Sequence, residues 1–296
     1  MNTLVVIVGP TGIGKTDVSI SLAEKTGTEI ISADSRQFYK ELRIGSAMPD
    51  ELQLAKIKHH FIAHLSIHDY YNASTFEFEV IDLLNVLFKK NKLVYMVGGS
   101  GMYIDAVCKG IDDLPEIDME IRSILQQKYE NEGIESLRFE LKRLDPEYYS
   151  IVDLKNPKRI LKGLEICLMT GRTYTSFRKA EVKKRDFKIL KIGLRMDRET
   201  LYKRIDSRVD KMIEASLVDE ARMLYKYKGI NALNTVGYKE LFDHFDGKYN
   251  LDKAIELIKR NSRRYAKRQL SWFGRDKEIK WFYPGDEKAI LNLIES

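Results

Sequence analysis

The stretch GPTGIGKT at residues 9–16 decides the fold class of this 296-residue chain. It matches the pattern GxxxxGK followed by Ser or Thr at every fixed position. A continuous apolar run, LVVIV at residues 4–8, precedes it, and helical spacing to about residue 26 follows it. A strand, a glycine-rich turn and a helix in this order are the context in which the pattern binds phosphate groups. The stretch therefore predicts an α/β protein built around a P-loop.

The chemistry of this loop favours an oligophosphate ligand. Glycines allow backbone N–H groups to turn toward phosphate oxygens, and the start of the next helix adds the positive end of its dipole. Lys15 supplies a positive charge to the outer phosphate, and the Thr16 hydroxyl is a ligand for Mg²⁺. The loop indicates the ligand but not the reaction. We predict phosphate contacts for all eight residues: Gly9, Pro10, Thr11, Gly12, Ile13, Gly14, Lys15 and Thr16.

Further strands are spaced so that helices fit between them. Short apolar or aromatic runs predict them at residues 29–32, 93–97, 187–195 and 279–283. Strands that alternate with helical stretches favour a three-layer core with a parallel sheet, as in P-loop NTPases.

The middle of the chain has a different pattern. Residues 112–186 show helical periodicity with no strand signal, interrupted by proline and glycine. We therefore predict an all-helical insertion domain at residues 112–186, and a core formed by residues 1–111 and 187–296.

The composition limits the class of protein. Hydrophobic residues make up 44% of the chain and charged residues 32%, enough for a core and a solvated surface. No segment approaches the roughly 20 consecutive apolar residues of a membrane span, and the first apolar run is typical of a strand rather than a signal peptide. We expect a cytoplasmic protein with no membrane partner. Cys108 and Cys167 cannot form a four-cysteine zinc site or a disulfide framework. The net charge of +6 permits a nucleic-acid partner without requiring one.

Polar side chains follow two of the predicted strands. Asp34, in IISADSRQFY, comes just after the second strand, where it faces the crevice above the strand ends. It can act as a general base, help to hold Mg²⁺, or cap a helix. Ser100 lies among three glycines in VGGSGMY after the third strand. Such a turn can bring backbone N–H groups and a hydroxyl close to a ligand, or it can simply connect strand and helix.

In order and spacing, these segments resemble the bacterial tRNA dimethylallyltransferases. That family shows a GPTGxGKT loop, a DSxQ-Y segment, IGxAxP, an HHL-D stretch and GGTGxY. The counterparts here are residues 9–16, 34–39, 44–49, 59–65 and 98–103. Later counterparts are NPKRILKGLEI, IGLRMDRETLYKRIDSRVDKM, NTVGYKE and RRYAKRQLSWF, at residues 156–166, 192–212, 234–240 and 263–273. The resemblance covers nearly the whole chain.

This resemblance implies a reaction. Dimethylallyl diphosphate would donate its prenyl group to N6 of the adenine 3′-adjacent to the anticodon in tRNA, with Mg²⁺ as cofactor. The loop would then hold a diphosphate leaving group, and no ATP would be split. Asp34 is implied as the base that removes the N6 proton, Ser100 as a hydroxyl near the leaving oxygen or the base, and Arg208 as an arginine that reaches the diphosphate.

The resemblance also implies contacts with the anticodon stem-loop of tRNA. Among them, Gln37 would touch the acceptor adenine once this base has left its stack. Residues 259–275 carry seven basic residues and no acidic one, which suits phosphate contacts, although a solvated basic face is the commoner meaning of such a run. We expect a monomer. The implied tRNA contacts are Asp34, Ser35, Arg36, Gln37, Ser100, Arg122, Lys158, Arg159, Ile160, Leu161, Lys162, Gly237, Tyr238 and Lys239.

Four positions depart from the family pattern. Ser100 stands in place of the usual threonine and keeps the hydroxyl. Met48 stands in place of a lysine, so any charge contact made there is lost. Phe38 and Ser216 replace a small aliphatic residue and a glycine, and we interpret both as packing changes.

Three other functions share some of these features. A P-loop kinase of a small metabolite would use Asp34 to activate a hydroxyl, but it gives no reason for VGGSGMY or the basic C-terminal segment. An RNA-binding module switched by a nucleotide would need an acidic end on the third strand, which ends in glycines. A prenyltransferase acting on free AMP would lack the insertion.

Overall fold

A six-stranded, all-parallel sheet forms the centre of the computed structural model, which describes residues 1–296 except 113, 116–117 and 180. Its strands lie in the order β3-β2-β4-β1-β5-β6. The strands are β1 Thr3–Val8, β2 Ile30–Ser32, β3 His59–His60, β4 Leu93–Gly98, β5 Lys188–Leu194 and β6 Lys280–Phe282. The predicted α/β class with a parallel sheet is confirmed.

Contacts within the chain divide it into two compact units. Unit 1 consists of Met1–Cys108 and Lys184–Ser296, and unit 2 of Lys109–Lys183. Unit 2 thus begins and ends a few residues before the insertion predicted at residues 112–186. Within the described part of the chain, no helix combines the length and apolarity that crossing a bilayer requires.

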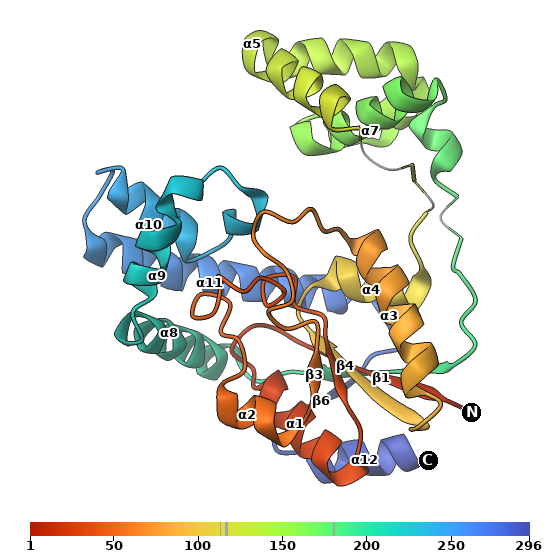
Figure 1. The fold of residues 1–296 in the computed structure, drawn as a ribbon, viewed down its shortest axis with the longest axis vertical. Coiled ribbons are helices and arrows are strands. Elements are labelled where there is room, and N and C mark those ends of the chain that lie inside the picture. The colour runs from red at the N-terminus through yellow and green to blue at the C-terminus, as the bar shows by residue number, and fades with distance from the viewer. Residues whose placement is uncertain (113, 116–117, 180) are drawn as a thin grey trace. The chain divides into compact units, whose positions relative to one another are not determined.

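Helices cover both faces of the sheet in unit 1, which gives the three layers. Alternate residues of a strand point to opposite faces. Accordingly, Leu4, Val6 and Val8 lie in one hydrophobic core, and Val5 and Ile7 in a second. The first core includes residues of α3, α4, α9 and α10, the second those of α1 and α12, and α8 and α11 contribute to both. The α-helices of this unit are α1 Lys15–Thr26, α2 Glu51–Lys56, α3 Ala73–Leu87, α4 Gly101–Lys109, α8 Arg198–Glu214, α9 Leu217–Leu224, α10 Tyr238–Phe245, α11 Leu251–Phe273 and α12 Glu287–Glu295. In Figure 1, the helices labelled α3 and α4 lie on one side of the strands, and those labelled α1 and α12 lie on the other.

The strand register brings the predicted site segments to one edge of the sheet. Val8, at the end of β1, pairs with Gly98 at the end of β4. Ser32, at the end of β2, pairs with Val97 of β4. A Cβ atom on Gly98 would lie 2.2 Å from the carbonyl oxygen of Ala33, so only glycine allows the two backbones to approach this closely. The segments after β1, β2 and β4 therefore emerge side by side.

Unit 2 is a small helical domain with a hydrophobic core of its own, which includes Leu125, Leu141 and Leu164. Of the breaks predicted from proline and glycine, Pro115 lies in the irregular segment after α4, and the others fall at helix ends or at a kink: Gly133, Pro146, Pro157 and Gly171. Pro146 and Pro157 are the first residues of α6 and α7. A backbone N–H at this position has no partner within the helix, so proline removes no hydrogen bond there. Its helices are α5 Met119–Leu144, kinked at Gly133, then α6 Pro146–Ile151, α7 Pro157–Thr170 and the 3-10 helix η1 Tyr174–Phe177.

Candidate active site

The loop between β1 and α1 has the geometry of a phosphate cradle. Gly9, Gly12 and Gly14 have φ angles of 155°, 77° and 101°, a region that strains residues with a side chain. No side chain caps α1, so the N–H groups of its first turn remain available to a ligand. The Lys15 ammonium lies against the loop, donating to the carbonyl oxygens of Gly9 at 3.0 Å and Pro10 at 2.9 Å.

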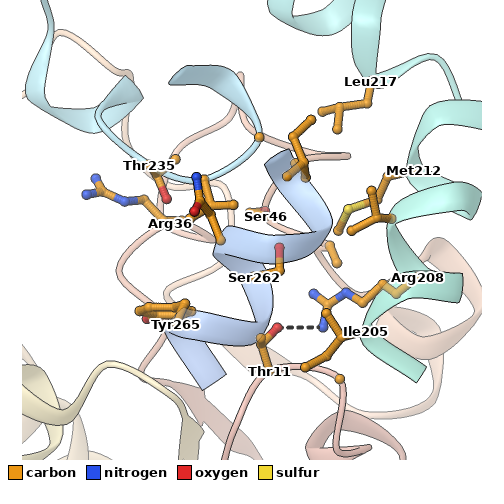
Figure 2. A pocket seen from close by; sticks show the side chains of 18 of the residues that line it. Thr11, Arg36, Ser46, Ile205, Arg208, Met212, Leu217, Thr235, Ser262 and Tyr265 are labelled. Atoms are coloured by element: carbon orange, nitrogen blue, oxygen red, sulfur yellow. Dashed lines mark hydrogen bonds between the residues drawn. The ribbon is translucent and has the colours of Figure 1, made fainter. Parts of the chain in front are cut away.

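A cavity of about 1430 Å³ in unit 1 opens onto this loop. Among the described residues, its lining carries ten lysines and arginines but only four acidic residues, so it suits an anionic ligand. Apolar side chains from α8 and α9, such as Met212 and Leu217, cover another part of the wall (Figure 2). The predicted residues in the lining are Thr11, Gly12, Gly14, Lys15, Thr16, Asp34, Ser35, Arg36, Gln37, Arg208, Gly237 and Lys239.

Arg208 reaches the loop from α8. Its guanidinium donates to the Thr11 hydroxyl at 3.0 Å, the hydrogen bond drawn in Figure 2. Burial lowers the pKa of Arg208, and the nearby negative charge of Asp34 opposes that shift. Burial also lowers the pKa of Lys15 to about 8, where the charge of Asp34 again raises it and that of Arg208 lowers it. The three charged groups therefore interact in one site.

Asp34 and Ser100 lie on neighbouring turns. The Ser100 hydroxyl accepts from the backbone N–H of Ser35 at 2.9 Å and donates to the Ser35 hydroxyl at 3.1 Å. The Asp34 carboxylate accepts from the backbone N–H of Arg36 at 3.0 Å, so it stabilises a turn and does not cap a regular helix. Burial, followed by the charge of Asp34, raises the pKa of Tyr265 to about 12, and both residues line the same cavity.

No cluster of protein ligands for a metal is present among the described residues, since no three His, Cys, Asp or Glu side chains converge. The cavity nevertheless offers the Thr16 hydroxyl and the Asp34 carboxylate beside the phosphate loop. This sparse oxygen set fits Mg²⁺, which usually keeps several waters and takes further ligands from substrate phosphates.

Two predicted tRNA contacts need correction. The side chains of Tyr238 and Ile160 are fully buried, at 0% exposed, so neither can touch an RNA at the surface. The Tyr238 hydroxyl instead donates to Glu220 at 2.6 Å, and Ile160 belongs to the core of unit 2. Both residues shape the packing beneath their exposed neighbours.

Gln37 lines the cavity, but its amide also forms internal hydrogen bonds. Its Oε1 accepts from the Ser32 hydroxyl at 3.0 Å, and its Nε2 donates to the carbonyl oxygen of Ala47 at 3.2 Å. The predicted contact with an extruded base would use the remaining hydrogen-bonding capacity of this amide.

The predicted tRNA-binding residues of unit 2 are of several kinds. Lys158 and Arg159 are exposed at the start of α7, and Leu161 and Lys162 are half-buried. Arg122 forms two hydrogen bonds to Glu165, at 2.6 and 2.9 Å. Burial lowers the pKa of Lys162, with Glu165 raising it and Arg122 lowering it, so these three charges form one cluster.

The basic residues of α11 have two distinct roles. Lys259 pairs with Asp210 at 2.6 Å, and Arg263 pairs with Asp206 at 2.5 Å, which fastens α11 to α8. The exposed cations on this helix that line the cavity are Arg260, Arg264 and Arg268. The second group suits contacts with a ligand, whereas the paired residues hold α11 in place, a division that the run of basic residues did not predict.

Three of the family departures have a structural explanation. Phe38 is fully buried and stacks on Phe76 at 5.3 Å, which confirms a packing change. Met48 lines the cavity, where it offers no charge. Ser216 has a φ of 72°, so its change from glycine concerns the backbone, and the packing interpretation is wrong.

Two buried polar residues of the site were not predicted. Gln269, on α11, joins the phosphate loop to the turn that carries Ser100. Glu220, on α9, accepts hydrogen bonds from three successive N–H groups, those of Arg43, Ile44 and Gly45. Gln269 lies in a segment that resembles the family, at residues 263–273, whereas Glu220 lies between two such segments. Neither has a pattern that distinguishes it from a surface residue.

Known proteins resemble this chain in sequence over most of its length. The model of the IPP transferase family matches residues 37–276. A tRNA dimethylallyltransferase 1 from Bacteroides fragilis is 54% identical over 294 residues, which is 99% of this chain and 98% of that protein. Another, from Porphyromonas gingivalis, is 51% identical over 99% of this chain and 98% of its own length.

Solved structures agree. A tRNA isopentenylpyrophosphate transferase from Bacillus halodurans is 34% identical, with a TM-score of 0.72, covering 100% of this chain and 96% of that one. A eukaryotic dimethylallyltransferase acting on tRNA is 28% identical, with a TM-score of 0.77, covering 92% of this chain and 70% of that one. With its P-loop core and its match over most of its length, the chain belongs to the IPP transferase family.

Proposed function

We propose that this protein transfers the dimethylallyl group of dimethylallyl diphosphate to N6 of the adenine 3′-adjacent to the anticodon in tRNA. The observation that carries this proposal is a single cavity in which Lys15, Arg208 and Asp34 interact beside the phosphate loop. Relatives similar over nearly their full length are named tRNA dimethylallyltransferases, which favours this function over that of a small-molecule kinase.

The first half of the reaction is the departure of diphosphate. The allylic C–O bond breaks most easily when the charge developing on the diphosphate is neutralised. Lys15 and Arg208 supply two positive charges, and the loop N–H groups add hydrogen bonds. The Thr16 hydroxyl would hold Mg²⁺, with Asp34 close by, and the ion when bound would add further positive charge to the leaving group.

The second half is attack by the adenine amino group, whose lone pair is delocalised into the ring. As the N6–carbon bond forms, N6 must lose a proton, and Asp34 would accept it. Ser100 holds the backbone of Ser35 next to Asp34 and so keeps this turn in place. The products are the prenylated adenine and inorganic diphosphate.

We propose that tRNA is bound by the exposed cations of the cavity and of unit 2. An adenine in the anticodon loop must leave its stack to enter a pocket, which costs a few kcal/mol. Contacts with phosphates compensate for this cost. Because the acceptor is tRNA, we place the protein in the cytoplasm. We also expect a monomer.

One assay tests this function. The protein is incubated with labelled dimethylallyl diphosphate and tRNA, AMP or ATP. We expect label on tRNA alone. Label on AMP would support an adenylate prenyltransferase instead, and ADP formation without prenylation would support a kinase.

The role of Asp34 is tested with Asp34→Asn, which keeps an acceptor for the Arg36 N–H but cannot take a proton. General-base catalysis contributes about 10²- to 10⁴-fold, so turnover should fall by that factor. The affinity for tRNA should stay within about twofold, since one carboxylate contributes little to phosphate contacts. Unchanged turnover would show that Asp34 is not the base.

A further inference from the structure

The side-chain amide of Gln269 links the two halves of the proposed active site. Its Oε1 accepts from the backbone N–H of Thr11 at 2.8 Å, and its Nε2 donates to the carbonyl oxygen of Gly99 at 2.9 Å. The side chain is 5% exposed, so water does not compete for these hydrogen bonds. Only one orientation of the amide satisfies both partners, because a backbone N–H needs an acceptor and a carbonyl needs a donor.

Gly99 leaves the space that this amide fills. A Cβ atom on Gly99 would lie 2.1 Å from Nε2 of Gln269 and 3.3 Å from its Cδ. The next atom is the carbonyl oxygen of Gly9, at an ordinary 3.7 Å. The φ of Gly99 lies outside the left-handed region. The backbone therefore accepts alanine at position 99, and the glycine is needed because of Gln269.

The two linked segments have different tasks in the proposed reaction. Thr11 belongs to the phosphate loop, and its hydroxyl accepts from Arg208. Gly99 precedes Ser100, which holds Ser35 beside Asp34. The first segment holds the leaving group, and the second positions the base.

We propose that Gln269 is a positioning residue that sets the separation between the phosphate loop and the turn of Ser100. This inference rests on the proposed function. The reacting carbon is held through its diphosphate by one segment, while proton removal depends on the other. A shift of about 1 Å between such groups can cost about 10²-fold in rate. Binding of either substrate alone depends on one segment only, so it should change little.

The test uses Gln269→Met, Gln269→Ala, Gly99→Ala and the double variant Gly99→Ala with Gln269→Ala in the full-length protein. We expect kcat to fall by about 10- to 100-fold in each single variant, with KM for dimethylallyl diphosphate within about threefold. Gly99→Ala should have no further effect in the Gln269→Ala background, because the amide it displaces is gone. Leu270→Met, a volume-conserving change next along α11, is the control and should keep wild-type kcat.

Three results would overturn the inference: wild-type kcat in Gln269→Met, a fall in kcat matched by an equal loss of active sites in single-turnover titration, or an equal effect of Gly99→Ala in both backgrounds. The matched loss would mean that Gln269 only supports folding. A wild-type protein that transfers no label to tRNA would overturn the proposed function and this inference with it, whereas active wild type with fully active variants would overturn the inference alone.

Discussion

At residue 216 the backbone has a left-handed conformation that serine adopts only with strain. Ser216 has φ 72° and ψ 35°, and its side chain forms no capping hydrogen bond to α9. The left-handed conformation costs a residue with a Cβ about 1–2 kcal/mol in the folded state. Glycine avoids this cost, but it also makes the unfolded chain more flexible, which offsets part of the gain in stability. Ser216→Gly should therefore raise the free energy of unfolding by about 0.5–1 kcal/mol in urea denaturation.

The same substitution at a helical position is the control. Ser271 lies within α11, where glycine is unfavourable, so Ser271→Gly should lower the free energy of unfolding by about 0.5 kcal/mol. Equal changes in the free energy of unfolding of both variants would show that serine at residue 216 does not destabilise the protein through backbone strain.

The charge of Lys15 makes diphosphate binding sensitive to alkaline pH. Its pKa is lowered from the ordinary 10.5 to about 8, chiefly by burial. Above pH 8 the free protein loses the ammonium that the diphosphate needs. Affinity for dimethylallyl diphosphate without tRNA should fall by up to about tenfold per pH unit between pH 8 and 10, as measured by calorimetry.

Unfolding does not explain such a decline. An unfolded lysine keeps its proton up to its ordinary pKa of 10.5, so the unfolded chain binds more protons in this window and rising pH favours the folded state at this residue. Lys15→Arg keeps its charge throughout and should give a flat profile, even with weaker binding. A constant wild-type affinity from pH 7 to 9.5 would contradict a titrating Lys15.

Single residues can be predicted from sequence when a local pattern defines their role. The spacing at residues 9–16 is such a pattern, because glycine geometry and the lysine act within one turn. Gln269 and Glu220 are different, because their partners are far along the chain. Hydrogen bonds of that kind become visible only when the fold brings the segments together.

At the scale of elements, Glu220 connects α9 to the loop before α2. Its carboxylate accepts from the N–H groups of Arg43, Ile44 and Gly45 at 2.9–3.0 Å and from the Tyr238 hydroxyl. Glu220→Gln keeps the shape but replaces one acceptor oxygen with a donor. An unsatisfied buried group costs about 1–3 kcal/mol, so the free energy of unfolding should fall by that amount.

Glu256→Gln, at an exposed position on α11, is the matched control, since its carboxylate pairs with Lys253 at the surface. That variant should unfold at the wild-type urea concentration. Glu220→Gln should also lower turnover, because the loop it holds continues into Ala47 and Met48 of the cavity wall. Full stability of Glu220→Gln would mean that the loop does not depend on this carboxylate.

Strands of three residues or more could be predicted from apolar or aromatic runs, and the signal is most continuous in β1 and β4, which are buried on both faces. β3 could not, since it has only two residues, His59 and His60, and pairs with β2 along one edge. Helix ends in unit 2 could be predicted from Pro146, Pro157 and Gly171, because proline and glycine act through their own backbone.

At the scale of the whole molecule, the excess of basic residues predicts a salt-dependent partner. If tRNA contacts several exposed cations, log Kd should rise linearly with log salt concentration. Arg264→Ala, which removes one cavity-lining cation, should reduce the slope by about one. Lys288→Ala, on exposed α12, should leave it unchanged. A salt-independent Kd in filter binding would exclude phosphate contacts as the main source of affinity.

The hydrogen bond between Thr11 and Gln269 spans 258 positions of the chain. During synthesis on the ribosome, the loop that is made first must wait for α11, which is made almost last. β1 also stays without one neighbour until β5, after unit 2, has been made. A polypeptide interrupted before residue 269 therefore carries an intact P-loop pattern without the partner that holds it, so premature termination removes the link between the two halves of the site however complete the P-loop itself is.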